Sequence, residues 1–343
     1  MSATTPTGSA ETRPRRARVF MLGASGTIGR ATLRALLARG HEVVCLVRPG
    51  KGLAVPPAAD LNDWPPASAV FRHGDPSHRD SLAREGFRGE RFDALVSCMA
   101  SRTGVPRDAW AIDHQAHVDA LELARQAGVQ HMVLLSAICV QKPMLAFQHA
   151  KLAFEQRLME SGLTYSIVRP TAFFKSLSGQ VERVRQGKPF LVFGDGTLTA
   201  CKPISDRDLA HYLADCLEDP ALQNRVLPIG GPGPAITPRQ QGEHLFALFG
   251  QAPQFRQVPP ALLSAIALLL GAAGRLIPGL AAKAELARIG HYYATESMLV
   301  LDPKTGRYDT EATPSTGADT LFDYYAQLVR GEARAERGEH AVF

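Results

Sequence analysis

The sequence lacks the features that mark several large classes of protein. Its five cysteines lie far apart, and none stands in a Cys-x-x-Cys pair or beside histidines at metal-ligand spacing. We therefore expect no metal or iron–sulfur site, and instead small buried thiols in a reducing compartment. The charge is modest too, with 38 Lys and Arg against 33 Asp and Glu. Because no basic stripe with interleaved aromatic residues is present, no nucleic-acid partner is expected.

Long hydrophobic runs are scarce as well. Residues 1–17 are rich in Ser, Thr, Pro and Arg and have no apolar signal core, which predicts a disordered tail. One apolar stretch, residues 259–280, is broken by Arg275 and by prolines before it reaches the ~20 residues of a spanning helix. It is interpreted first as a buried helix, then as the wall of an apolar pocket, then as a shallow membrane contact. We expect a cytoplasmic protein with at most peripheral membrane contact.

What the chain does contain is an alternation of short β-branched runs with helical stretches. Strands are predicted at residues 18–23, 41–48, 69–75, 92–100, 129–137 and 163–170. This alternation predicts an α/β fold with a doubly wound parallel sheet, the NAD(P)-binding Rossmann fold. The predicted organisation is a disordered tail at 1–17, an NADP-binding core at 18–170, a smaller C-terminal substrate-covering region at 171–330, interleaved with the remaining sheet elements, and a tail at 331–343.

The clearest motif is a glycine-rich turn between the first strand and the first helix. Glycines there permit a tight turn, let the backbone approach a pyrophosphate, and let the helix pack closely on the strand. The preceding strand and following helix supply the context that such a motif needs. The turn residues predicted to bind the cofactor are Gly23, Ser25, Gly26, Thr27, Ile28 and Gly29.

The end of the second strand distinguishes between the two nicotinamide cofactors. NAD sites place Asp or Glu there to bind the ribose hydroxyls, but this chain has Arg48 and no adjacent acid. A guanidinium pairs with a 2′-phosphate, and Arg30 directly follows the last glycine, so NADPH is predicted. The alternative interpretation is that Arg48 is a surface arginine at a strand end with no role in cofactor binding. Asp75, after the third strand, is a candidate at the adenine end or a residue that caps a turn.

Three residues at and after the fifth strand are the catalytic candidates. Ser136 ends that strand, where ligands bind in such sheets, although a hydroxyl bonded to its own backbone is an equal alternative. Lys151 lies four residues beyond Phe147 on a predicted helix, so the two share a face. The lysine can bond the nicotinamide ribose, whereas most lone helical lysines are solvated. Phe147 stands where a Tyr-x-x-x-Lys reductase would carry its acid.

The order of these motifs resembles a known group of proteins. GASGTIGR, LVRP, HGD, LLSA and IVRPTAFF follow one another as in atypical short-chain dehydrogenase/reductases of the NmrA-like and isoflavone-reductase-like branch. A narrower likeness covers nearly the whole chain. FQHAKLAFEQRL, GDGTLTACKPISDRDLA and YYATESMLVLDPKTGRYDTEATPSTGADTL resemble the divinyl chlorophyllide 8-vinyl-reductase family. The resemblance implies an NADPH-dependent oxidoreductase, free of flavin and clusters, that reduces the 8-vinyl group of divinyl chlorophyllide or protochlorophyllide to ethyl in chlorophyll or bacteriochlorophyll synthesis.

The implied tetrapyrrole substrate gives Phe147 a chemical reason, and the family also has Phe at this place. Reduction of a carbonyl by hydride creates an alkoxide that a nearby acid must protonate. Hydride addition to a conjugated vinyl group instead leaves an anion spread over the macrocycle. A phenyl ring offers that macrocycle a flat apolar surface, which Phe173, Phe174, Tyr292 and Tyr293 are candidates to extend, although such aromatic pairs more often belong to the core.

Two other functions stay open at this point. One is another isoflavone-reductase-like or quinone reductase acting on a conjugated double bond. The other is a non-catalytic NADPH-binding regulator or assembly factor, for which the absent tyrosine is the main argument. Lys175, Arg169 and His149 are equal candidates for the pigment's carboxylate, and the sequence indicates no proton donor.

Overall fold

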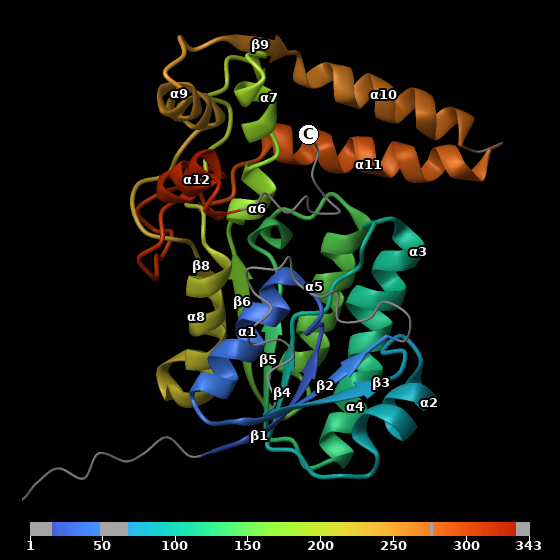
Figure 1. Cartoon of the computed structure of the whole chain (residues 1–343). Helices are drawn as coiled ribbons and strands as arrows, with labels where there is room; N and C mark the ends of the chain where they lie inside the picture. The colour runs from blue at the N-terminus through green and yellow to red at the C-terminus, as the bar shows by residue number, and fades with distance from the viewer. Residues whose placement is uncertain (1–15, 49–67, 275–276, 334–343) are drawn as a thin grey trace, which may run out of the picture.

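Seven parallel strands form the central sheet, in the order β3-β2-β1-β4-β5-β6-β8. The computed structural model describes residues 16–48, 68–274 and 277–333 (Figure 1). The strands of the sheet are β1 (Arg18–Leu22), β2 (Glu42–Val47), β3 (Ala69–His73), β4 (Ala94–Ser97), β5 (His131–Leu135), β6 (Thr164–Pro170) and β8 (Arg225–Ile229). The first six confirm the predicted strands and the parallel doubly wound sheet.

The strand order reverses between β1 and β4, which pair directly through Leu22 and Ser97. From β1 the chain moves outward through β2 to β3, and from β4 it moves the other way through β5 and β6. A reversal of this kind leaves a crevice outside the carboxyl ends of the two central strands, where ligands of open α/β sheets bind.

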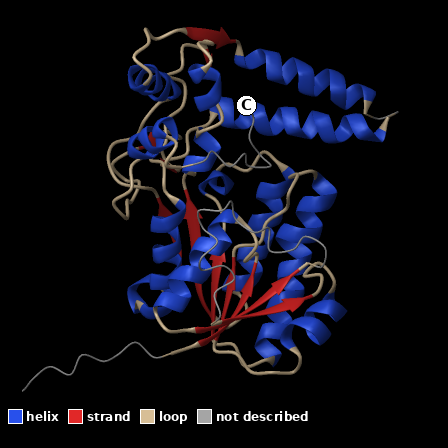
Figure 2. Ribbon diagram, in the orientation of Figure 1, coloured by secondary structure: helices blue, strands red, loops and turns tan. Residues whose placement is uncertain are grey.

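Helices cover both faces of the sheet, as Figure 2 shows. On one face α1 (Thr27–Ala38) and α8 (Asp206–Glu218) bury their apolar sides against the strands. On the other face α4 (His117–Gln126) and α5 (Ala146–Met159) do the same. The other helices are α2 (Arg79–Ser81), α3 (Pro106–Ala109), α6 (Phe174–Leu177), α7 (Val181–Arg185), α9 (Pro238–Leu248), α10 (Pro260–Ala273), α11 (Pro278–Thr295) and α12 (Leu321–Arg330).

A second layer lies beyond the carboxyl ends of the strands and has an apolar core of its own (Figure 1). In it β7 (Phe190–Phe193) pairs in parallel with β9 (Phe255–Val258), and β10 (Val300–Leu301) pairs with β11 (Tyr308–Asp309). The fully buried Tyr325 of α12 donates its hydroxyl to the Leu177 carbonyl at 2.7 Å. The boundary at residue 170 stays a prediction, while β8 and α8 return to the sheet after it.

Parts of the predicted organisation fall on residues that are not described. Residues 1–15, 49–67 and 334–343 lie outside the described part of the chain, and with them most of the tails predicted at 1–17 and 331–343.

The interpretation of residues 259–280 as a buried helix is wrong. Their α10 forms a hairpin with α11 that projects from the second layer (Figure 1). Ala267 is the one buried residue of α10, whereas the side chains of Leu268 and Leu269 are 74% and 69% exposed. Apolar composition favoured burial, but it does not specify which surface covers a helix. Among the described residues no helix is both long and apolar enough to cross a bilayer.

Candidate functional site

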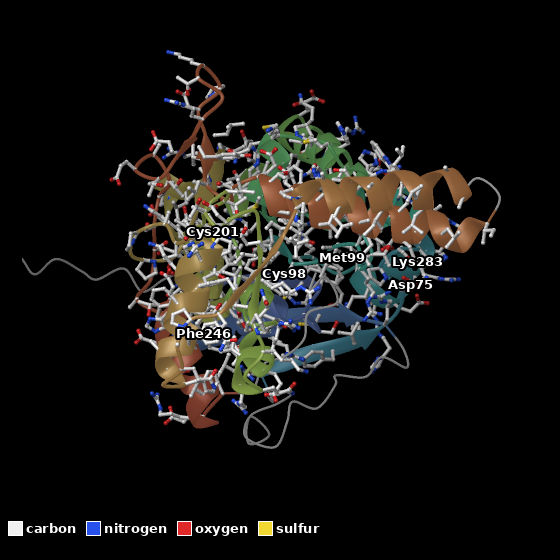
Figure 3. All side chains as sticks on the ribbon, turned by 90° about the horizontal axis from the view of Figure 1, so that it is seen from above. Asp75, Cys98, Met99, Cys201, Phe246 and Lys283 are labelled. Carbon is white, nitrogen blue, oxygen red and sulfur yellow. The ribbon has the colours of Figure 1, made fainter. Side chains whose placement is uncertain are left out.

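The glycine-rich turn joins β1 to α1 directly at the strand reversal. Gly23 has a φ of +80°, and a Cβ built there would lie 2.5 Å from the carbonyl carbon of Cys98. A Cβ on Gly29 would lie 2.0 Å from the Gly23 carbonyl oxygen. Figure 3, seen from above, shows Cys98 and Met99 near the centre of this edge. Both glycines are therefore required by close backbone contacts, as the dinucleotide prediction expects.

The start of α1 suits a diphosphate. Gly26 is the N-cap, and no side chain in the described part of the chain caps the helix, so its first amides and the positive end of its dipole are available at the crevice. Lys175 of α6 donates from Nζ to Thr27 Oγ1 at 2.8 Å, which brings a positive charge to the turn. The sequence left Lys175 open as a partner of the pigment's carboxylate. Because the two residues are 148 positions apart, only the fold reveals this placement.

The predicted residues of the adenosine end lie along the same edge of the sheet. Arg48 follows β2 with an exposed side chain, and Arg30 lies in the first turn of α1. Asp75 lies farther out beyond β3, as Figure 3 shows. Its carboxylate accepts hydrogen bonds from the Ser77 amide at 2.9 Å and the Ser77 hydroxyl at 2.6 Å. Burial acts to raise the pKa of Asp75, but these bonds and His78 lower it overall. Its contact with adenine stays a prediction.

A cavity of about 400 Å³ opens beside the turn, between the sheet and the second layer. Ser136 and Pro170 at the ends of β5 and β6 form its floor, and Phe147 and Lys151 of α5 line it as well. The walls are largely apolar, so a flat hydrophobic ligand can be desolvated there. The prediction that Phe147 and Lys151 share a face is confirmed.

Side chains and backbone around α5 hold these two residues in place. Gln148 Oε1 accepts from the Leu145 amide at 2.9 Å, and its Nε2 donates to the Cys139 carbonyl at 3.1 Å. The first turn of α5 is thereby fixed to the segment that follows β5. Phe147 then points into the cavity from a rigid base, which is the preorganisation that a binding surface needs.

Lys151 forms a buried ion pair. Its Nζ lies 3.0 Å from Asp113 Oδ1, and the two side chains are 11% and 0% exposed. Asp113 lies in a π-helical segment, Trp110–Ala116, of the kind that is frequent at functional sites. Asp113 Oδ1 also accepts from the Ser101 amide at 3.2 Å, while Oδ2 is buried without a hydrogen-bond partner among the described residues. The sequence prediction missed Asp113, which lies 38 positions before its lysine.

Ser136 is part of a second buried cluster. Its hydroxyl donates to Glu155 Oε1 at 2.5 Å, and Glu155 is 1% exposed. Arg169 at the end of β6 donates to the same carboxylate, with Nε 3.2 Å from Oε1 and Nη2 on Oε2. Arg169 is thus engaged inside the fold, and His149 is exposed on α5. The catalytic role of Ser136 stays a prediction, with its hydroxyl proton directed at Glu155.

The aromatic candidates of α11 separate in the structure. Tyr292 is buried, donates its hydroxyl to the Cys139 carbonyl at 2.8 Å, and does not line the cavity. Tyr293 does line it and is 39% exposed. Of the four aromatic candidates, Phe173 and Tyr293 line the cavity, whereas Phe174 and Tyr292 do not. Together these elements can hold a nicotinamide beside a flat apolar acceptor with water largely excluded.

Known proteins share this architecture and sequence. A family model described as NAD(P)H-binding matches residues 23–220. The chloroplastic divinyl chlorophyllide a 8-vinyl-reductase of Oryza sativa subsp. indica is 48% identical over 338 residues, which are 96% of this chain and 83% of the relative. The protein of that name from Arabidopsis thaliana is 46% identical over 336 residues, 95% of this chain and 80% of the relative.

Solved structures agree on the fold. The structure of the NADPH-dependent quinone oxidoreductase QOR2 from Escherichia coli, complexed with NADPH, aligns with a TM-score of 0.64 over 90% of this chain and 99% of that one. At 19% identity this likeness concerns the fold alone. It confirms the predicted Rossmann architecture. Because the alignment covers 90% of this chain, the likeness in fold includes most of the second layer.

Proposed function

This chain belongs to the family of divinyl chlorophyllide a 8-vinyl-reductases, and from that premise we propose how its cavity performs the reaction. The protein is an NADPH-dependent oxidoreductase that reduces the 8-vinyl group of divinyl chlorophyllide to ethyl. The observation that carries the assignment of the site is that Lys151 and Phe147 line one largely apolar cavity, whose lining includes Cys98, the residue against which Gly23 of the turn packs. In our proposal the ends of β4 and β5 would hold the nicotinamide, and Phe147 would offer its ring to the macrocycle.

The cofactor fits the residues at the turn, because the close approach at Gly23 and Gly29 leaves no room for other side chains. The open N-terminus of α1 and Lys175 would hold the diphosphate, and Arg48 with Arg30 would hold the 2′-phosphate. When bound, NADPH supplies the hydride for the vinyl group. Arg48 has an exposed guanidinium at the end of β2 and no acid beside it, which favours NADPH over NADH.

Lys151 positions the reacting groups in this scheme. Its ammonium is anchored by Asp113 at 3.0 Å, which leaves its remaining N–H donors for the nicotinamide ribose. A fixed ammonium also stabilises the negative charge that develops on the acceptor. Phe147 contributes a flat apolar surface and needs no acidic proton, because a conjugated vinyl group does not become an alkoxide.

The substrate range is also a proposal. The vinyl chemistry is the same on divinyl protochlorophyllide, so we expect that pigment as a second acceptor, whether the product serves chlorophyll or bacteriochlorophyll synthesis. A direct test incubates the purified protein with NADPH and each pigment and follows the Soret band and the mass of the product. A blue-shifted Soret band and a mass increase of two hydrogens are expected. Unchanged pigment with protein that binds NADPH would contradict the proposal.

We further propose that the α10–α11 hairpin places the enzyme on the surface of a pigment-bearing membrane. No charged residue occurs in α10, and its apolar side chains are distributed around the whole helix. Helices that are apolar on every side are normally covered by protein core or lipid. Among the described residues of the hairpin, the exposed large apolar side chains are Leu262, Ile266, Leu268, Leu269, Ile277 and Leu286, together with Tyr293 at the cavity.

Lipid suits this surface better than a second protein. Protein interfaces carry a polar rim, which α10 does not provide. The 14 residues of α10 extend about 21 Å, less than the ~30 Å of a hydrocarbon core, so a shallow contact is favoured over a span. The exposed Lys283 and Arg288 of α11 can meet anionic headgroups. The inner side of α11 lines the cavity, so a pigment could enter directly from the membrane.

A further inference from the structure

Reduction of a vinyl group needs a proton as well as a hydride, and α11 carries an acid into the cavity. We propose that the hydroxyl of Tyr293 donates the second hydrogen of the reaction, in place of the phenol that α5 lacks at position 147. This inference rests on the proposed arrangement of pigment and cofactor. It adds a catalytic residue that comes from a different element of the fold.

The position of Tyr293 supports this role. Tyr293, Phe147 and Lys151 line the same cavity. One helical turn before Tyr293, Ile289 reaches the first turn of α5: a Cβ on Gly104 would lie 2.9 Å from Ile289 Cδ1 and 3.5 Å from Phe147 Cδ1. Residues four apart share a helix face. Tyr293 therefore lies on the face of α11 that borders Gly104 and Phe147.

The proton of Tyr293 is also less committed than those of Ser136 and Thr171, two other hydroxyls that line the cavity. Among the described residues, the hydrogen-bond partner of its hydroxyl is Cys139 Sγ at 3.8 Å, and sulfur is a weak acceptor. Ser136 directs its proton to the Glu155 carboxylate, and Thr171 donates to the Lys202 carbonyl. Both of those acceptors are strong oxygen groups, so releasing either proton would cost more.

The surroundings of the phenol keep it protonated before the reaction. Although the residue as a whole is 39% exposed, burial around its hydroxyl raises the pKa of Tyr293 well above its ordinary value, so it stays a neutral acid at physiological pH. Lys151 lines the same cavity, and its charge acts against the raised pKa of the neighbouring Cys139 thiol.

In the proposed reaction one hydride and one proton are added across the vinyl double bond. Hydride from NADPH adds to the terminal carbon of the vinyl group, which becomes CH₃, and the electron pair of the double bond moves to the inner carbon and the macrocycle. The Tyr293 O–H bond breaks and its proton forms a C–H bond at the inner carbon, which gives the ethyl group. The phenolate then takes a proton from water. NADPH is oxidised to NADP⁺ and the vinyl group is reduced.

The test is Tyr293→Phe, which removes only the hydroxyl. We expect kcat to fall about 100-fold or more, in the range of general acid catalysis, while NADPH and pigment affinities change less than about threefold. Proton transfer should become rate-limiting in the variant. The isotope effect with C4-deuterated NADPH should therefore shrink while the solvent deuterium isotope effect grows. A residue that merely positioned the nicotinamide would slow hydride transfer and leave the hydride isotope effect undiminished.

Tyr292→Phe is the matched control, since Tyr292 is adjacent, bonds the same Cys139 and does not line the cavity. Its kcat should stay within about threefold of the parent. Parental kcat and isotope effects in Tyr293→Phe would overturn the inference, as would a loss explained by weaker NADPH binding. Inactivity of the unmodified protein toward every divinyl pigment would instead refute the proposed function.

Discussion

At the scale of single residues, the chemistry depends on a few side chains whose partners come from elsewhere in the chain. Lys151 is recognisable from its spacing to Phe147, yet the residue that fixes its charge is Asp113 on a different helix. The glycine turn was predictable because its constraints are local and backbone-based. Lys175 and Asp113 were not, because their contacts are set by the packing of distant segments.

Replacing Lys151 with Met should impair catalysis strongly. The change keeps the length of the side chain but removes the charge that positions the nicotinamide ribose, and it leaves the Asp113 carboxylate buried and unpaired. We expect kcat to fall about 100-fold and stability to fall by a few kcal/mol. Steady-state turnover and urea unfolding check this, with Lys304→Met, on an exposed loop, as the control. Retained turnover would remove Lys151 from the site.

Replacing Arg48 with Ala should relax the choice of cofactor. A charge-assisted hydrogen bond to a phosphate contributes about 1.5–3 kcal/mol, so the Kd for NADPH should rise about tenfold or more. The Kd for NADH should not change. Because Arg48 is exposed, the fold should be unaffected. Fluorescence titration of both cofactors measures this, and equal use of NADH and NADPH by the unmodified protein would contradict the assignment.

At the scale of elements, the sequence predicted which segments form helices and strands better than it predicted which surfaces cover them. The periodicity of α1 and the β-branched runs of β1, β2 and β5 determine both their structure and their buried faces. For α10 the residues predict a helix, but an evenly apolar helix has no preferred face, so its exposure could not be predicted. The projecting hairpin is visible only once the second layer is in place (Figure 1).

The exposed hairpin yields a test of membrane contact. Leu268→Glu combined with Leu269→Glu should abolish co-flotation with vesicles that contain anionic lipid, because two charges would enter hydrocarbon. Turnover of detergent-dispersed pigment should remain within about threefold, since neither residue lines the cavity. Val70→Glu, at another exposed apolar residue on β3, is the control and should still float. Equal flotation of the double variant and the parent would contradict the proposal.

At the scale of the whole molecule, two buried histidines should make stability depend on pH. Burial lowers the pKa of His117 and of His131 to about 4. The unfolded chain takes up these protons near pH 6.5, whereas the folded chain resists them. Stability is therefore full above about pH 6.5 and is lost as the pH falls toward about 4, by up to ~1.4 kcal/mol per pH unit for each histidine.

Urea unfolding of the parent and of His131→Gln at several pH values between about 7.5 and 4.5 measures this dependence. The variant should lose roughly half of the contribution that these two histidines make to the slope, because His117 remains. Identical slopes in the two proteins would show that His131 titrates normally in the folded state.

The central claim is that one cavity brings the nicotinamide of NADPH to the vinyl group of a divinyl pigment. The most direct measurement uses NADPH deuterated at C4, on the transferred face, and locates the label in the product by NMR and mass spectrometry. The account predicts one deuterium in the terminal methyl of the 8-ethyl group, with the other new hydrogen drawn from solvent. Unreduced pigment, or an ethyl group without that deuterium, would contradict it.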